Sequence, residues 1–293
     1  MTITGLLPAA DIAAAAQLAC LLEVSAAKPG NVTRDHRFAD TGYEDFLASA
    51  AAIGAPLAGA ADRPLGATVR LAVEATRRWC RSNTNLGIVL LLAPLARAAL
   101  AARSGSAWRD AVRHVLDEST SEDARDVYAA IRLASPGGLG RVDDQDIARE
   151  PDKTLLETMR LATARDGIAR EYATAFEVTF EAGAPAIERA RRDGLPWDAA
   201  VVETFLTLLA RTPDTHVARR SGTAKAAAVT ERARAVMSAG GVRTPAGRAA
   251  IDEMDRELRD ARNSANPGTT ADLTTAAIFV ALVTGGWSHS SDA

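Results

Sequence analysis

The chain has 293 residues, of which 47% are apolar and 24% charged, and 34 Lys and Arg against 37 Asp and Glu give a net charge of −3. This composition is typical of soluble globular proteins, and its acidic balance provides no overall attraction to the phosphates of a nucleic acid. The most apolar runs, 86–96 and 273–283, are shorter than the roughly 20 residues that a transmembrane helix requires. We therefore expect neither a nucleic-acid nor a membrane partner.

The two cysteines, Cys20 and Cys80, have no CxxC partner and no His at ligand spacing, so the sequence does not support a zinc site or a disulfide framework. The N-terminus lacks the positive region and the small-residue cleavage site of a signal peptide. Both observations favour a reducing compartment, and we expect a cytoplasmic protein.

Alanine dominates the sequence, only 4% of the residues are aromatic, and β-branched residues seldom alternate as strands require. We therefore predict an all-α protein, a single-domain multi-helix globular bundle over residues 1–293. The spacing of Ile12, Ala16, Ala19 and Leu22 indicates a first helix with one apolar face. This helix should end before the Lys28-Pro29-Gly30 turn, because proline and glycine interrupt a helix. Small alanine faces fit a homodimer contact or the core equally well.

Further helices are indicated in chain order. Runs 86–96 and 273–283 are predicted to be core helices, and a helix after Pro196, capped by Asp198 and ending near Arg211, has the apolar stripe Val201, Phe205, Leu208 and Leu209. Breaks are expected at 59–66, 104–106, 135–140 and 240–247.

Segment 135–152 contains three glycines, two prolines and five acidic residues. It is expected to be either a solvated surface connection or an acidic loop that acts as a lid. Such a loop lies within the domain and does not divide it.

The segments least compatible with a helix are also the most polar, and each precedes or interrupts an apolar helix. Turns at helix ends can direct backbone N–H groups and short polar side chains at one point, which indicates a phosphate ligand. These segments are 28–31, 83–87, 213–216, 240–244 and 266–272.

Lysine occurs only at positions 28, 153 and 225, so Lys28 is not background composition. It is either a point charge for a phosphate or a solvated side chain at a turn. Asn31 and Asp35 follow within reach of the same pocket.

Asn83 and Asn85 precede a buried helix, and capping explains one of them but not both. In the last segment, Thr269 or Thr270 is expected to cap a helix. Asp272 then lies in the first turn, either as a structural acid that the macrodipole favours or as a metal–phosphate ligand.

His216 follows Asp214 by two positions, and that carboxylate could orient the imidazole or raise its pKa, as a general base requires. The alternative is a cap or a surface side chain, and His36 beside Asp35 is a weaker candidate of the same kind. Glu171 belongs to a run of alternating charges that is typical of a solvated face, although the break at Gly167 allows a catalytic role.

No GxGxxG, Walker, HExxH or GxSxG motif is present. Taken together, the polar segments resemble the triphosphoribosyl-dephospho-CoA synthase family, in the family's order, from about residue 18 to 283. The matching positions are Glu23 with 28–32, Asp45-Phe46 with Ser49-Ala50, 83–85 with Gly87, Asp214-Thr215 with 217–219, 240–245, and 266–268 with 271–273.

The resemblance implies an all-helical enzyme that binds ATP and dephospho-CoA, displaces adenine from ATP and joins the ribose to the 2'-hydroxyl of the acceptor. It places Asp214 or His216 near that hydroxyl, with Glu171 as a further catalytic candidate. The residues it assigns to phosphate or nucleotide are Lys28, Asn31, Asn83, Thr84, Asn85, Arg219, Arg243, Thr244, Asn266 and Gly268. Its candidate ligands for Mg²⁺ on the triphosphate are Glu23, Asp35 and Asp272.

The sequence departs from the family where Asn85-Leu86 replaces a His-Lys pair, where segment 166–172 replaces a Gly-Ala-Arg-Gly-Glu-Ala word, and where loop 136–152 is extra. These features resemble a divergent branch found in archaea and methylotrophic bacteria. Two alternatives follow. One is a related transferase, using ATP or a pyrophosphate ester, that acts on another coenzyme precursor in pterin- or furan-type one-carbon carrier synthesis. The other is a non-catalytic helical binding or scaffold protein.

Overall fold

Helices are the only regular elements in the part of the chain that the structure describes, and no strand occurs there. The structure is a computed structural model that describes residues 1, 7–102, 107–136, 145–260, 262–285 and 287. The predicted all-α class is confirmed.

In chain order the elements are α1 (Ala9–Ser25), α2 (Tyr43–Ala52), α3 (Gly54–Ala58), α4 (Leu65–Arg77), α5 (Leu86–Ala101), α6 (Trp108–Asp117), α7 (Ser121–Ala134), α8 (Leu155–Ala162), α9 (Gly167–Thr174), the π-helix η1 (Thr179–Gly183), α10 (Ala184–Arg192), α11 (Trp197–Arg211), α12 (Thr215–Ser221), α13 (Thr223–Ser238), the 3-10 helix η2 (Gly241–Arg243), α14 (Pro245–Leu258) and α15 (Gly268–Val283).

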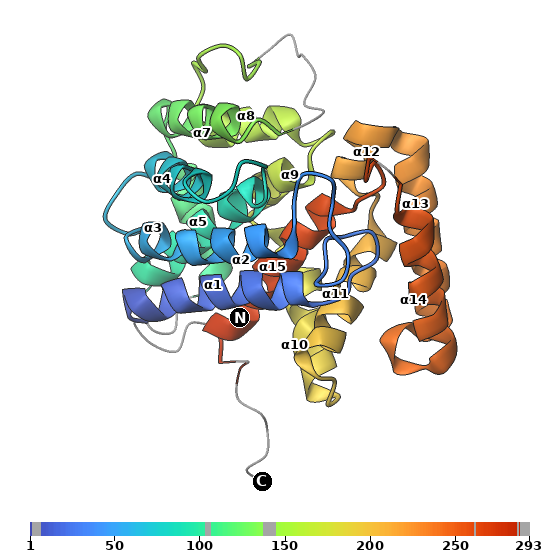
Figure 1. Cartoon of the computed structure of the whole chain (residues 1–293). Helices are drawn as coiled ribbons and strands as arrows, with labels where there is room; N and C mark the ends of the chain where they lie inside the picture. The colour runs from blue at the N-terminus through green and yellow to red at the C-terminus, as the bar shows by residue number, and fades with distance from the viewer. Residues whose placement is uncertain (2–6, 103–106, 137–144, 261, 286, 288–293) are drawn as a thin grey trace.

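The two apolar runs form the buried helices α5 and α15, as predicted. α15 passes through the middle of the molecule and packs on α1, α5, α10 and α11 (Figure 1). Burial on nearly every side explains why both helices are apolar all round. None of the described helices combines the length and apolar character needed to cross a membrane.

The outer helices enclose this centre from different sides. α7 and α8 pack together at one end, with α7 also lying on α4, while α13 and α14 form an antiparallel pair along another side (Figure 1). The N-terminal ends of α5, α9 and α15 are left facing one another between these layers. That arrangement positions the site described below.

Several predicted boundaries are confirmed. α1 ends at Ser25, before the Lys28-Pro29-Gly30 turn, and α11 ends at Arg211. The predicted break at 59–66 separates α3 from α4, and the break at 240–247 contains η2 and the start of α14. The predicted break at 104–106, and residues 137–144 of the predicted acidic loop, lie outside the described residues, whereas 135–136 and 145–152 are non-helical.

The predicted cap of α11 is wrong. Pro196 is the N-cap residue, and no side chain caps the helix. Asp198 lies in the first turn, where its negative charge interacts favourably with the positive end of the helix dipole. It forms no capping hydrogen bond.

Candidate functional site

A cavity of about 740 Å³ lies where the C-terminal end of α1 meets the N-terminal ends of α5, α9 and α15, and it extends between α7 and α8. The helix dipole makes each helix start favourable for an anion. The polar turns at 28–31, 83–87 and 266–272 all contribute to its lining, as does His216 from the turn at 213–216. The expected convergence of distant turns is thus observed, except for the turn at 240–244.

Lys28 lies in the wall of this cavity, with only 1% of its surface exposed. Its ammonium group is 3.1 Å from Glu23 Oε1 and also donates to the carbonyl oxygens of Glu23 and Ala26. Burial raises the pKa of the Glu23 carboxyl, and the charge of Lys28 opposes that rise. The cation is therefore held in one place by its own helix end, and it is not a solvated turn residue.

Asp272 reaches the cavity from α15 and forms no hydrogen bond or ion pair with any described residue. Its carboxylate packs against Gly87 in the first turn of α5, where a Cβ atom would collide with Oδ2, so a glycine is required there. The pKa of Asp272 is raised well above 3.8, first by burial and then by the negative charges of Glu23 and Asp214. This carboxylate is thus available to a ligand.

No group of three or more His, Cys, Asp or Glu side chains that could hold a metal ion exists among the described residues. Mg²⁺ ordinarily takes one or two carboxylates together with substrate phosphates and water. Glu23 and Asp272 both line the cavity and match that smaller donor set, whereas the exposed Asp35 is not part of the lining.

The polar residues before α5 have separate contacts, although all of them line the cavity. Asn83 Oδ1 accepts from the N–H of Leu86 at 3.1 Å. Asn85 instead donates to Thr76 Oγ1 at 3.0 Å, and the hydroxyl of Thr84 contacts Ser49. The N-cap residue Asn85 therefore forms no capping hydrogen bond and joins the turn to α4, while Asn83, two residues earlier, satisfies the first N–H of the helix.

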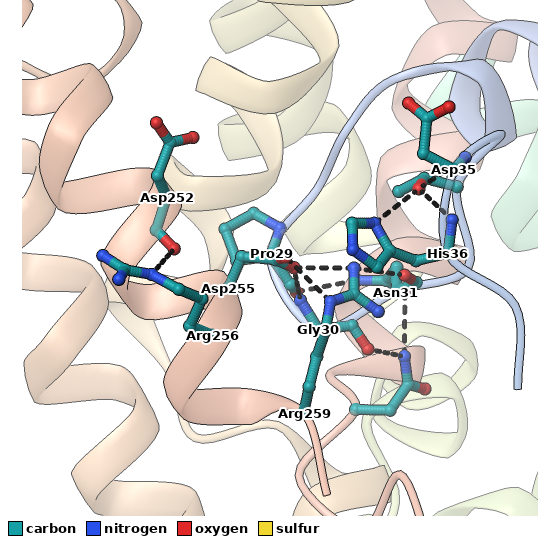
Figure 2. A network of polar contacts seen from close by, with 11 residues as sticks. Pro29, Gly30, Asn31, Asp35, His36, Asp252, Asp255, Arg256 and Arg259 are labelled. Carbon is teal, nitrogen blue, oxygen red and sulfur yellow. Dashed lines mark hydrogen bonds and ion pairs between the residues drawn. The ribbon is translucent and has the colours of Figure 1, made fainter.

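The turn at 28–31 is fixed from outside the cavity by the end of α14 (Figure 2). Asp255 Oδ1 accepts from the N–H of Gly30 at 2.8 Å, and Arg259 donates to the carbonyl oxygen of Asn31 at 3.1 Å while it pairs with Asp255 at 2.7 Å. From the other side, Asn266 Nδ2 donates to the carbonyl of Gly30 at 2.8 Å and to Asn31 Oδ1 at 3.1 Å.

His216 is oriented by the same loop. Its Nδ1 lies 3.0 Å from the carbonyl oxygen of Asn266, and because a carbonyl only accepts, Nδ1 is the protonated nitrogen and Nε2 is the free acceptor. Gly268 allows this approach, since a Cβ there would lie 2.9 Å from Nδ1. Burial lowers the pKa of His216, and the opposing charge of Asp214 is a smaller effect. Asp214 therefore raises the pKa as expected, but burial outweighs this effect, and the carbonyl of Asn266 orients the ring instead of Asp214.

Asp214 has a different task. Its Oδ1 accepts from the N–H of Val217 at 3.0 Å and caps α12, while Oδ2 accepts from the N–H and the hydroxyl of Thr270, each at 2.7 Å. The prediction that Thr269 or Thr270 caps α15 is wrong, because both lie inside the helix and the capping oxygen comes from Asp214. Asp272 consequently lies beyond the first turn of α15.

Arginines approach the cavity from α12 and from the loop before α9. Arg219 is paired with Asp166 at 2.7 Å, and both line the cavity. Arg165 also lines it, and its guanidinium forms no hydrogen bond or ion pair with the described part of the chain. The cavity lining thus contains a neutralised arginine and an available one.

Five candidates do not line the cavity: Asp214, described above, and Glu171, Arg243, Thr244 and Asp35. Glu171 is fully buried and accepts from the N–H groups of Val178 and Thr179 and from the Thr179 hydroxyl, so it joins α9 to η1. Arg243 pairs with Glu203 at 3.0 Å and with Asp193, and Thr244 caps α14. These residues and Asp35 lie outside the cavity wall.

Sequence reasoning missed Asp255 and Arg259. The signal was their i, i+4 spacing on a helix, but such pairs usually lie on solvated faces, and only the fold reveals that this pair faces a turn from the start of the chain. It also missed Arg165, which belongs to a charged run without a motif.

Comparisons with known proteins show the family to which the chain is similar. The family described as ATP:dephospho-CoA triphosphoribosyl transferase (CitG) matches residues 9–291. A crystal structure of an Archaeoglobus fulgidus protein provisionally named triphosphoribosyl-dephospho-CoA synthase is 31% identical, covers 82% of this chain and 99% of its own, and superposes with a TM-score of 0.62.

Curated relatives have the provisional name 2-(5''-triphosphoribosyl)-3'-dephosphocoenzyme-A synthase. The protein of Pseudomonas aeruginosa strain UCBPP-PA14 is 34% identical over 137 residues, which is 46% of each chain, and that of Stutzerimonas stutzeri is 32% identical over 52% of this chain and 51% of its own. The matched region thus spans about half the length of these relatives. Because the family match extends over nearly the whole sequence, the chain belongs to the ATP:dephospho-CoA triphosphoribosyl transferase family.

Proposed function

We propose that this chain is a transferase that displaces adenine from the ribose of ATP and joins the triphosphoribosyl group to the 2'-hydroxyl of dephospho-CoA. The observation that carries the proposal is the meeting of three helix starts, Lys28, Asp272 and His216 in one cavity. Family membership supports the same reaction.

The polar end of the cavity suits the triphosphate. Lys28 supplies a fixed positive charge, and Asn31, Asn83 and Asn266 supply amides beside the N–H groups of the helix starts. Arg219 adds a second cation that Asp166 already orients. When Mg²⁺ is bound, Asp272 and Glu23 would hold it against the phosphates, where it neutralises their charge.

His216 is the candidate base. Its Nε2 would take the proton of the 2'-hydroxyl as the oxygen bonds to C1' of the ATP ribose, while the electrons of the C1'–N9 bond leave with adenine, which gains a proton. Asp214 would act indirectly, by fixing α12 and the start of α15. Carboxylates at Asp272 and Asp166 would favour positive charge that develops on the ribose.

The test is a reaction of the purified protein with Mg²⁺, ATP and dephospho-CoA, analysed by mass spectrometry. Free adenine and a product heavier than dephospho-CoA by the triphosphoribosyl group are expected. Adenine release only when another coenzyme precursor replaces dephospho-CoA would identify the related transferase instead. If calorimetry with Mg-ATP shows no heat, the scaffold alternative is favoured.

A cytoplasmic location and a homodimer complete the proposal. Cys20 and Cys80 are both buried and unpaired, as a reducing compartment permits. Sedimentation equilibrium would decide between monomer and dimer.

A further inference from the structure

The cavity has an apolar half that the transfer chemistry does not use. Its walls come from α7, with Val127, Ile131 and Ala134, and from α8, with Met159 and Leu161. Val127 and Ala134 are buried, whereas Leu161 is 46% exposed although it is a large apolar side chain, so the wall presents apolar surface at Leu161. An apolar surface inside a ligand cavity is favourable for binding an apolar group, because burial removes it from water.

One edge of this half is held in place by hydrogen bonds. The hydroxyl of Tyr128 donates to the carbonyl oxygen of Gln145 at 2.7 Å, and Arg132 donates to that of Ile147 at 2.9 Å. Both donors belong to α7, so the segment at 145–147 is fixed along the wall. The apolar half is therefore bounded by a helix pair and a fixed segment.

Arg165 lies in the chain between the lining residues of α8 and those of α9. Arg165 follows α8, whose residues line the apolar half, and precedes Asp166, which is paired with Arg219 in the polar half. Its guanidinium is unpaired with respect to the described residues, as noted above. A ligand that crosses from one half to the other would pass an available positive charge.

We propose that the apolar half binds the pantetheine arm of the acceptor and that Arg165 binds the acceptor's diphosphate, an inference that rests on the proposed function. Dephospho-CoA has a ribose with the reacting 2'-hydroxyl, a diphosphate, then an arm with two methyl groups, two amides and a thiol, and the lining offers His216, Arg165 and the apolar residues of α7 and α8 to these three parts. The methyl groups match the apolar walls of α7 and α8. A pterin or furan acceptor without such an arm would leave this half empty.

The test compares dephospho-CoA with ADP, which has the ribose and diphosphate but no arm. Calorimetry gives the dissociation constant of each for the wild type, Leu161→Ser and Leu133→Ser. Leu133 is a matched control because it is 39% exposed on the neighbouring helix α7 and does not line the cavity. We expect Leu161→Ser to reduce the preference for dephospho-CoA over ADP by about fivefold to tenfold, and Leu133→Ser to leave it unchanged.

Arg165 has its own comparison. Arg165→Ala is expected to weaken dephospho-CoA and ADP alike, by about tenfold, because both have the diphosphate, whereas the exposed Arg160→Ala on α8 should weaken neither. Far-UV circular dichroism and melting temperatures verify that all variants fold.

The outcomes separate the two proposals. If the wild type releases no adenine but prefers dephospho-CoA through Leu161, the proposed function fails and the arm site stands. If the wild type turns over normally and Leu161→Ser keeps its full preference, or if the wild type binds ADP as tightly as dephospho-CoA, the arm site is overturned.

Discussion

The Asp255 carboxylate accepts the backbone N–H of Gly30 at 2.8 Å, and this hydrogen bond joins residues that are 225 positions apart. Arg259 completes the contact by donating to Asn31 while it pairs with the same carboxylate. The turn with the phosphate candidates is therefore fixed by α14, a helix that does not itself line the cavity.

Replacing Asp255 with Ala should leave the N–H of Gly30 without its partner and Arg259 without its counter-ion. We expect a loss of about 1–3 kcal/mol in the free energy of unfolding and a larger rise in KM for ATP than fall in kcat. Denaturant titration and initial rates measure both.

The control for this variant is Asp252→Ala, one turn earlier on α14, where the side chain is exposed. Asp255→Asn should restore most of the affinity for ATP, because an amide oxygen still accepts from Gly30. If Asp255→Ala loses stability while KM for ATP stays at the wild-type value, Asp255 has only a structural role.

Lys28→Met tests the buried ion pair. Because removal of one partner leaves the Glu23 charge buried and uncompensated, we expect the variant to lose about 3–5 kcal/mol of stability as well as its activity. The double variant Lys28→Met with Glu23→Gln should recover most of the stability and none of the activity. An active double variant would show that the cation at position 28 is not needed for the triphosphate.

The contacts of Asp255 with Gly30 and of Lys28 with Glu23 also show which features of the site could be predicted from the sequence. Alanine content and helical spacing were sufficient for the all-α class, and the polar turns were sufficient for Lys28, Asn266 and Asp272 at one cavity. The partners were not predictable. Asp214 lies two positions before His216 in sequence, yet its carboxylate accepts hydrogen bonds from Thr270 and so satisfies a buried N–H at the start of α15.

Arg243 and Thr244 illustrate the opposite error. Their Gly-rich segment looks like a phosphate turn, but Arg243 is satisfied by Glu203 and Thr244 by the cap of α14. A turn that satisfies its own polar groups needs no ligand, and the sequence does not reveal which turns do so.

We expect the protonation of His216 to cause the fall of kcat/KM on the acid side of its pH profile. Burial lowers its pKa below the ordinary 6.5, so the neutral base persists at mildly acidic pH, and kcat/KM should fall only as the pH drops through that lowered value. His216→Gln should lower kcat and remove this limb from the remaining activity. A limb that survives in the variant would assign the base to another group.

The same shift has a consequence for folding. The pKa of His216 is about 6.5 in the unfolded chain and lower in the folded chain. Below about pH 6.5 the unfolded chain therefore binds more protons than the folded chain, and the wild type loses stability as the pH falls further. Melting temperatures between pH 7 and pH 5 should therefore decrease less in His216→Gln than in the wild type.

Asp272→Asn gives the opposite dependence. The pKa of the Asp272 carboxyl is raised in the folded state, so the wild type loses stability as the pH rises from about 4 through the raised value, where a buried charge must form beside Glu23 and Asp214. Asparagine cannot ionise. In buffer without metal or nucleotide, the melting temperature of the variant minus that of the wild type should therefore increase from pH 4 to pH 8.

Asp272→Asn should lose activity although it gains stability at high pH. Turnover should fall more than about 100-fold, because the amide supplies neither the negative charge nor the second oxygen for a metal-bound triphosphate. Asp198→Asn, an exposed change in the first turn of α11, is the control and should alter neither property with pH. If the stability difference stays flat and turnover is normal, Asp272 is an ordinary solvated carboxylate. If Asp272 binds a ligand, Asp272→Asn should be more stable than the wild type at high pH and should lose turnover.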